Sequence, residues 1–178
     1  MKNLLWLITL IAVIVVALFA YLGAFSEVLV TESRFGPHYF VYESFTGDYS
    51  RTGPIFDRVN KALSGAGLKT SKGLGIYYDD PKQVPKNQLR SDCGSLFATD
   101  PSEKIVKLKS NLKIRRLPST RAAMVAFPLR NKLSFFIGPS KAYPVLNAYL
   151  KEKKLEVKNF MELYDMAAKK IYYIAPTK

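Results

Sequence analysis

The chain of 178 residues has few of the side chains that bind metals or cross-link a fold, with one cysteine, Cys93, and one histidine, His38. A single cysteine cannot form a disulfide within the chain, and this pair of residues is too small a set for a structural zinc site. A lone histidine beside a proline, at the start of a predicted strand, is also a poor candidate for a haem ligand. We therefore expect no metal site and no cofactor.

Acidic residues are also scarce, with 14 Asp and Glu against 27 Lys and Arg, which gives a formal net charge of +13. Hydrophobic residues make up 48% of the chain, so it can bury a core, and wholesale disorder is excluded. The densest basic stretch covers residues 104–116, and runs of this kind are mostly solvated surface. A basic face of this kind also attracts anionic lipid headgroups. Nucleic acid is not an expected partner, because the sequence carries no nucleic-acid-binding motif.

Charged side chains are absent between Leu4 and Phe25, a run of 22 residues dominated by Leu, Ile, Val, Ala and Phe. As a helix this run would extend about 33 Å, the thickness of a bilayer core. Trp6 and Tyr21 lie near its two ends, where amphipathic rings favour the membrane interface. We expect an uncleaved single-pass transmembrane anchor. The alternative is a signal peptide with a cleavage site at residues 22–24, but the apolar run is long for one.

An internal repeat organises the rest of the chain. The helical segment around Asn60 resembles the segment around Asn147, 87 residues later, and each segment follows a Gly-Pro pair. The strand segment around Tyr78 resembles the segment around Tyr164 at an offset of 86, which sets Glu162 opposite the apolar Ile76. Two matches at nearly one period indicate a duplicated unit.

Each half of the repeat has the same predicted order of elements, a strand, a helix and two strands. In the first half we expect strands over 38–45, 74–78 and 90–97 and a helix over 55–63. In the second half we expect strands over 121–127, 161–164 and 171–174 and a helix over 141–153, with Pro144 in its first turn. The fold class is therefore α+β. Two β-α-β-β repeats would form one mainly antiparallel sheet with both helices on one face, preceded by a single transmembrane helix.

Alternation along the strand at 161–164 sorts its side chains onto two faces. Met161 and Leu163 share one face, which we expect to pack on the helices, while Glu162 and Tyr164 share the other, open face. A carboxylate among aromatic rings favours cationic ligands. We therefore take Glu162 and Tyr164, with Tyr77 and Tyr42 as further walls, as the candidate ligand-binding residues. The alternative is that Glu162 is a solvent-facing strand residue and that each tyrosine only fills the core or an interface.

A wider resemblance rests on several short stretches of this sequence. They are residues 75–85 (GIYYDDPKQVP), 93–96 (CGSL), 126–128 (AFP), 144–155 (PVLNAYLKEKKL) and 162–164 (ELY). Together they resemble the soluble domain of the testis-expressed ER-phagy receptor family, which belongs to the GyrI-like superfamily of small-molecule-binding domains. The resemblance covers roughly residues 35–176. It implies a domain that binds cationic or aromatic molecules or hydrolyses small electrophiles, with the acidic strand residue of the superfamily matching Glu162.

We expect three parts, a transmembrane anchor over 1–26, a linker over 27–36 and a GyrI-like domain over 37–178. The predicted location is a membrane, the endoplasmic reticulum with a cytosolic domain in a eukaryote or the inner membrane in a bacterium. The expected function is to hold a small cationic or aromatic molecule, or a peptide, on the open sheet face. The alternatives are a membrane scaffold or adaptor related to the ER-phagy receptors and a hydrolase with Glu162 as general base. An adaptor role lacks the acidic C-terminal tail with an aromatic motif on which those receptors depend.

Overall fold

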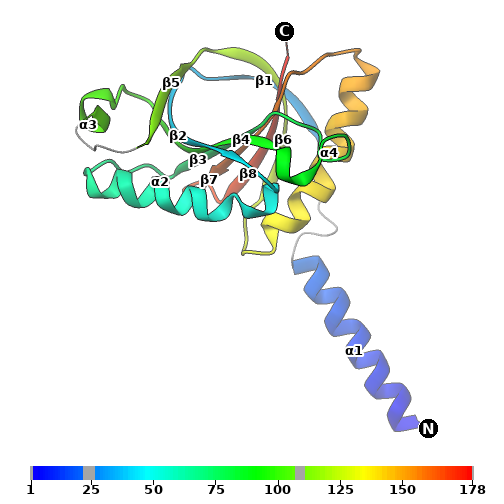
Figure 1. The fold of residues 1–178 in the computed structure, drawn as a ribbon. Coiled ribbons are helices and arrows are strands. Elements are labelled where there is room, and N and C mark those ends of the chain that lie inside the picture. Colours follow the sequence, from blue (N-terminus) through cyan, green and yellow to red (C-terminus); the bar gives the residue numbers. More distant parts are fainter. Residues whose placement is uncertain (1, 22–26, 107–110, 178) are drawn as a thin grey trace.

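The computed structural model describes residues 2–21, 27–106 and 111–177, and it shows an α+β fold around one eight-stranded sheet (Figure 1). The strands are β1 (Val30–Phe35), β2 (His38–Thr46), β3 (Lys72–Tyr77), β4 (Arg90–Phe97), β5 (Lys113–Leu117), β6 (Thr120–Pro128), β7 (Phe160–Asp165) and β8 (Lys170–Pro176). The helices are α1 (Lys2–Tyr21), α2 (Gly53–Gly65), α3 (Ser102–Val106) and α4 (Ser134–Glu152), with 3₁₀ turns η1 (Tyr49–Arg51) and η2 (Lys86–Gln88).

The strand order is β1-β6-β8-β7-β3-β4-β2-β5, and every pairing is antiparallel. This confirms the predicted α+β class, the antiparallel sheet and the duplicated unit, which appears as β2-α2-β3-β4 and β6-α4-β7-β8. The two units join where β3 pairs with β7 at the centre of the sheet. The central pair therefore brings together the strands that carry Tyr77 and Glu162.

Three elements were not predicted. β1 and β5 extend the two edges of the sheet, and α3 is a single short helix before β5. β1 lies in the stretch 27–36 that we expected to be a linker, and its sequence VTESRF is too polar to show a strand pattern. β5, KIRRL, lies in the basic stretch 104–116, of which residues 107–110 lie outside the described residues.

Helix α4 begins at Ser134, earlier than the predicted start at residue 141, so that Pro139 and Pro144 both lie inside it. The turn that leads into it is held by side chains that accept backbone hydrogen bonds. The Ser134 hydroxyl accepts from the N–H of Arg130 at 3.0 Å, and the Asn131 side chain accepts from the N–H of Leu133 at 2.9 Å. These contacts start the helix where the sequence shows no strong capping signal.

The sheet curls, and α2 and α4 lie on its outer, convex side (Figure 1). The concave side is closed by a cluster that includes Phe35 from one edge strand and Leu117 from the other, packed with Phe40, Leu74 and Ile174. The convex side packs against α4 through residues such as Val125, Phe127 and Leu146, and against α2 through Val41, Val59 and Leu63. The concave side is therefore a filled core rather than the open face that we predicted.

The apolar N-terminal segment forms α1, which ends at Tyr21, whereas the predicted membrane-spanning run continues to Phe25. Within the described residues, none of the helices has both the length and the apolar character needed to cross a membrane. This finding contradicts the predicted transmembrane helix, the single-pass membrane anchoring and the membrane localisation, whether in the endoplasmic reticulum or the inner membrane. Residues 22–26, which include the alternative cleavage site at 22–24, lie outside the described residues.

Candidate functional site

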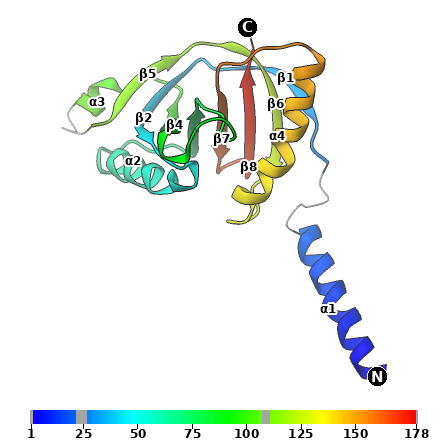
Figure 2. The same cartoon turned by 45° about the vertical axis from the view of Figure 1, so that its right-hand side comes forward.

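A groove with a volume of about 1280 Å³ lies between α2 and α4, over the central strands β3 and β7. Figure 2 shows β7 between the two helices. Aromatic rings from both helices and both strands contribute to the walls. The residues that matter most are Tyr49, Phe56, Asn60, Phe135, Tyr143 and, on the sheet, Gly73, Tyr77, Glu162 and Tyr164. The groove therefore gathers side chains from both halves of the repeat.

The side chains of β7 alternate as predicted, but the two sets face the opposite way. Met161 and Leu163 belong to the concave core, whereas Glu162 and Tyr164 face α2 and α4. The reason is the curl of the sheet, because its concave side must be filled by apolar residues from every strand. The polar pair then lies on the convex side, in the space between the two helices.

Glu162 is buried at the floor of the groove, with 9% of its surface exposed. Its Oε1 accepts a hydrogen bond from Tyr143 Oη at 2.7 Å, and its Oε2 accepts one from Tyr164 Oη. Burial raises the pKa of Glu162 above its usual range, and the two phenol hydrogen bonds partly oppose this shift. Among the described residues, Glu162 takes part in no ion pair.

The tyrosines form a chain across the two central strands. Tyr77 Oη lies 3.3 Å from Tyr164 Oη, so a phenol from β3 meets a phenol from β7. Burial raises the pKa of Tyr77, Tyr143 and Tyr164 well above the ordinary tyrosine value, so all three remain protonated at neutral pH. The group therefore offers donors to a carboxylate and ring faces to a ligand.

Further rings surround this chain. Phe56 of α2 lies edge-on to Tyr164 with ring centroids 5.4 Å apart, and Phe135 of α4 lies 5.5 Å from the same ring. Tyr143 lies edge-on to Phe160 at 5.5 Å. The carboxyl group of Glu162 is thus set in an aromatic pocket, as the sequence predicted, but the helices supply half of its walls.

Tyr42 does not belong to this pocket. Its ring stacks on Phe40 at 4.8 Å and lies under the Arg115 guanidinium at 4.9 Å, on the concave side of the sheet. Arg115 also pairs there with Asp92 at 3.1 Å. The structure therefore brings together three of the four predicted residues, Glu162, Tyr164 and Tyr77, and separates Tyr42 from them.

Tyr143, Phe56 and Phe135 were missed because aromatic residues on a helix are usually core. The repeat contained a signal that could have found two of them. Tyr77 and Tyr164 are 87 residues apart and share the groove, so the strands follow the same offset as the helices. At that offset Phe56 corresponds to Tyr143, and Glu162 corresponds to Gly75 rather than to Ile76.

Gly75 leaves room for the ring of Tyr77. A Cβ at Gly75 would lie 2.8 Å from Tyr77 Oη and 2.9 Å from two carbons of its ring. The ring therefore folds back over the strand at Gly75, and its hydroxyl reaches Tyr164. The two halves differ at this position because one supplies a carboxylate and the other supplies space.

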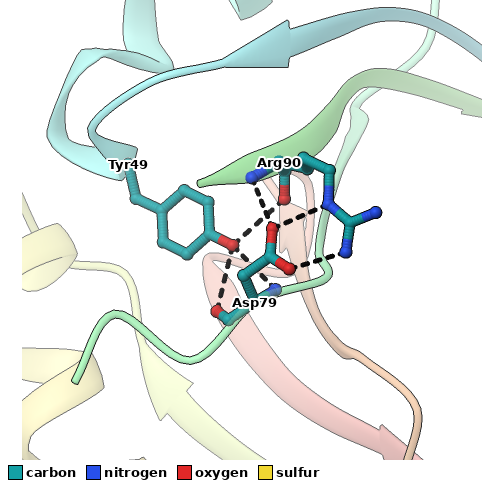
Figure 3. Close-up of polar contacts among 3 residues, drawn as sticks. All are labelled: Tyr49, Asp79 and Arg90. Carbon is teal, nitrogen blue, oxygen red and sulfur yellow. Dashed lines mark hydrogen bonds and ion pairs between the residues drawn. The ribbon is translucent and has the colours of Figure 1, made fainter. Parts of the chain in front are cut away.

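Tyr49 holds the mouth of the groove in place (Figure 3). Its hydroxyl accepts a hydrogen bond from the Asp79 N–H at 3.0 Å and lies 3.0 Å from the carbonyl oxygens of Asp79 and Arg90. The Asp79 carboxylate accepts from the Arg90 N–H and Nη2, both at 2.7 Å, and these bonds hold its pKa below the usual range. The Tyr49 ring packs edge-on to Tyr77 at 4.8 Å. We call these three residues, Tyr49, Asp79 and Arg90, the mouth cluster.

Cys93 and His38, whose residue types often bind metals or take part in reactions, lie away from the groove floor. Cys93 is buried on β4, and burial raises its pKa to about 12, so it is a poor thiolate. His38 packs edge-on to Phe35, and burial lowers its pKa. Within the described part of the chain, no cluster of three or more His, Cys, Asp or Glu side chains is placed to hold a metal ion.

No family model matches this sequence. The mouse homologue of testis-expressed protein 264 is 28% identical over 141 residues, which are 76% of this chain and 43% of the mouse protein. Human testis-expressed protein 264 is 27% identical over the same extent. The chain thus has weak homology to these relatives and spans less than half of their length.

Solved structures share the fold at low sequence identity. The C-terminal domain of EcmrR has a TM-score of 0.59 and 16% identity, over 85% of this chain and 98% of that domain. SAV2435, solved with bound tetraphenylphosphonium, has a TM-score of 0.55 and 13% identity, over 84% of this chain and 93% of that one. A hydrolase from Listeria innocua has a TM-score of 0.50 and 10% identity, over 87% and 95%. These similarities show that the chain shares its fold with these proteins.

Proposed function

We propose that the chain binds small aromatic cations in the groove between α2 and α4. The observation that carries this proposal is Glu162, a buried carboxyl group that forms no ion pair within the described residues. An ionised carboxylate in such a place is costly unless a counter-charge is present. A ligand cation supplies that counter-charge.

The surrounding rings support the same class of ligand. The negative faces of tyrosine and phenylalanine rings attract cations, and they also pack well against flat apolar groups. In this proposal Glu162 provides the charge, and Tyr143 and Tyr164 orient its carboxyl group. Tyr77, which contacts Tyr164, lines the space around the ligand with them. Tyr42 has no role, because it lies on the other side of the sheet.

The comparison with SAV2435 adds support, since tetraphenylphosphonium, its bound ligand, is an aromatic cation. Hydrolysis is less well supported by the geometry. A general base accepts a proton from water, and the phenol hydrogen bonds to both oxygens of Glu162 weaken it as a base because they stabilise its ionised form. The arrangement holds the carboxyl group still, which suits binding better than proton transfer.

The test is the thermal stability of the full chain with and without tetraphenylphosphonium. At about 100 times its dissociation constant, a ligand that binds only the folded state stabilises it by about 2.7 kcal/mol. We expect tetraphenylphosphonium to raise the Tm of the wild type and to leave the Tm of Glu162→Gln unchanged.

The matched control is Glu43→Gln, which removes a carboxylate that pairs with Arg58 outside the groove. This variant should respond to tetraphenylphosphonium as the wild type does. Equal stabilisation of wild type and Glu162→Gln, or no stabilisation of a folded wild type, would contradict the proposal.

A further inference from the structure

The two halves of the groove carry matching side chains with different chemistry. At the repeat offset of 87 residues, Phe56 matches Tyr143 and Tyr77 matches Tyr164. The charged position is the exception, because Glu162 matches Gly75. The half of the groove beside α4 is therefore acidic at its floor, whereas the half beside α2 has no buried acid at the matching place. Of the carboxylates that line this second half, Asp57 and Asp80 are exposed and Asp79 is paired with Arg90.

In the half beside α2, the Asn60 side chain is held in a position to bind a neutral polar group. The Ser95 hydroxyl, which is buried, donates to Asn60 Oδ1 at 2.8 Å. This bond fixes the amide so that its NH₂ group remains as a donor on the groove wall. Three other hydroxyl groups that line the groove are already bonded: Thr52 donates to the Tyr49 carbonyl at 2.9 Å, Thr70 donates to the Leu96 carbonyl at 2.8 Å, and Tyr49 belongs to the mouth cluster.

The size of the groove exceeds the needs of a single aromatic cation. Pockets for drug-sized ligands are about 300–1,000 Å³, and this groove has about 1280 Å³. A ligand that fills only the space around Glu162 would contact Phe56 and Tyr77, which meet Tyr164 there, but it would leave the part of the groove lined by Tyr49 and Asn60 unfilled. A longer molecule would fill that part as well and remove more apolar surface from water.

We propose that the ligand is elongated and two-ended, with an aromatic cation at Glu162 and a neutral aromatic group carrying a hydrogen-bond acceptor at Asn60. This inference rests on the proposed function, because it takes Glu162 as the site of the cation. It adds that Asn60, held by Ser95, determines specificity for the second end.

The test compares three probes on the full chain. The first is benzamidinium, a single-ended aromatic cation. The second is benzamidinium joined by alkyl chains of increasing length to a benzamide, whose carbonyl is the acceptor. The third is a bis-benzamidinium of the same lengths. In the wild type we expect an optimal length at which the benzamide-linked probe binds at least about tenfold more tightly than benzamidinium, since ring burial and a hydrogen bond both contribute.

Asn60→Asp should reverse the preference at that length. It replaces the amide donor with a carboxylate, so we expect the advantage of the benzamide-linked probe to fall about tenfold and the bis-benzamidinium to gain about tenfold. The matched control is Asn87→Asp, which adds the same charge at an exposed position away from the groove. It should leave the ranking of the three probes unchanged.

The possible failures are distinguishable. If benzamidinium binds in a Glu162-dependent way but no linked probe binds more tightly, or Asn60→Asp leaves the ranking unchanged, the two-ended ligand is contradicted and the proposed function stands. If benzamidinium binding does not depend on Glu162, the proposed function itself is contradicted. The comparison of linker lengths uses only the wild type, so it holds even if Asn60→Asp is unstable.

Discussion

Gly75 is the residue at which the two halves of the groove diverge. Because Gly75 has no side chain, the Tyr77 ring occupies the space beside it. That ring carries the hydroxyl that meets Tyr164. A single methyl group at this position would force the ring away from its partners. The shape of the pocket around Glu162 therefore depends on a glycine as much as on any side chain that lines it.

We expect Gly75→Ala to destabilise the fold by about 1–3 kcal/mol, the usual cost of overpacking, and to weaken binding of tetraphenylphosphonium. The free energy of unfolding from urea denaturation and a binding titration measure the two effects. Gly53→Ala is the control, because a Cβ there meets nothing within 4 Å, although Gly53 lines the same groove. Similar losses in both variants would argue against the steric account.

Tyr173 and Gly138 form a second close contact, between β8 and α4. A Cβ at Gly138 would lie 2.2 Å from Tyr173 Oη, and that buried hydroxyl has no hydrogen-bond partner within the described residues. We expect Gly138→Ala to be strongly destabilising and Tyr173→Phe to cost little, since no bond is lost.

The double variant of Gly138→Ala and Tyr173→Phe should recover most of the loss, with a coupling energy of about 1–3 kcal/mol from a double-mutant cycle of urea unfolding. Additive effects of the two substitutions would show that the Tyr173 hydroxyl does not limit the approach of the helix.

The sequence singled out Glu162, Tyr77 and Tyr164 as candidates because a carboxylate and phenols on predicted strands stand out against an apolar background. It did not identify Tyr143, which lies on a helix where aromatic residues are usually core. It also grouped Tyr42 with the site, because alternation within one strand does not say how two distant strands are aligned. Only the pairings of β2 with β4, of β4 with β3 and of β3 with β7 together fix that relation.

At the scale of elements, the order of strands and helices in the two repeats was predictable from local patterns, whereas the edges of the sheet were not. β1 and β5 are polar strands whose existence depends on partners far away in the chain, Val125 of β6 in one case and Val41 of β2 in the other. Strand propensity does not contain that information.

The direction of the two sheet faces could not be predicted either. Alternation separates Met161 and Leu163 from Glu162 and Tyr164, but the curl of the whole sheet decides which set faces the helices. Apolar side chains suit either buried side of the sheet, and here Met161 and Leu163 face the concave side. The N-terminal prediction was also wrong, since none of the helices in the described residues has the length and apolar character needed to cross a membrane.

The mouth cluster links three segments that frame the groove, η1, the loop after β3 and the start of β4. We expect Tyr49→Phe to destabilise the fold by about 1 kcal/mol, the usual value of a lost hydrogen bond, and to weaken tetraphenylphosphonium binding by loosening the Tyr77 wall. Urea unfolding and a binding titration measure both effects.

Tyr39→Phe is the control for Tyr49→Phe, because Tyr39 lies on β2 and does not line the groove. Unchanged affinity in Tyr49→Phe, together with a lower stability, would limit the mouth cluster to a structural role.

At the scale of the whole molecule, the buried carboxyl group couples stability and binding to pH. The folded-state pKa of Glu162 is raised, so the folded state holds the proton more tightly than the unfolded state. This contribution to stability is complete below about pH 4.5, the ordinary value for this carboxyl group. It is lost as the pH rises through the raised pKa.

Relative to Glu162→Gln, the wild type should therefore become less stable as the pH increases from about 4.5 toward neutrality. Urea unfolding of both proteins over this range measures the difference. Cation binding should show the opposite trend, because a cation favours the ionised carboxylate, and affinity should rise with pH over the same window. A pH-independent difference in stability would contradict the buried position of the carboxyl group.

A preference for a cation over a neutral compound is the most direct test of this site. The chain has a net charge of +13, and a strongly basic chain repels cations unless a local group attracts them. We would titrate wild type and Glu162→Gln, at a pH above the Glu162 pKa, with tetraphenylphosphonium and with neutral triphenylphosphine oxide. The account predicts that the wild type prefers the cation by at least about tenfold and that Glu162→Gln loses this preference. Equal affinity of the wild type for both compounds, or a cation preference that survives in Glu162→Gln, would contradict the claim that this carboxylate makes the groove a cation site.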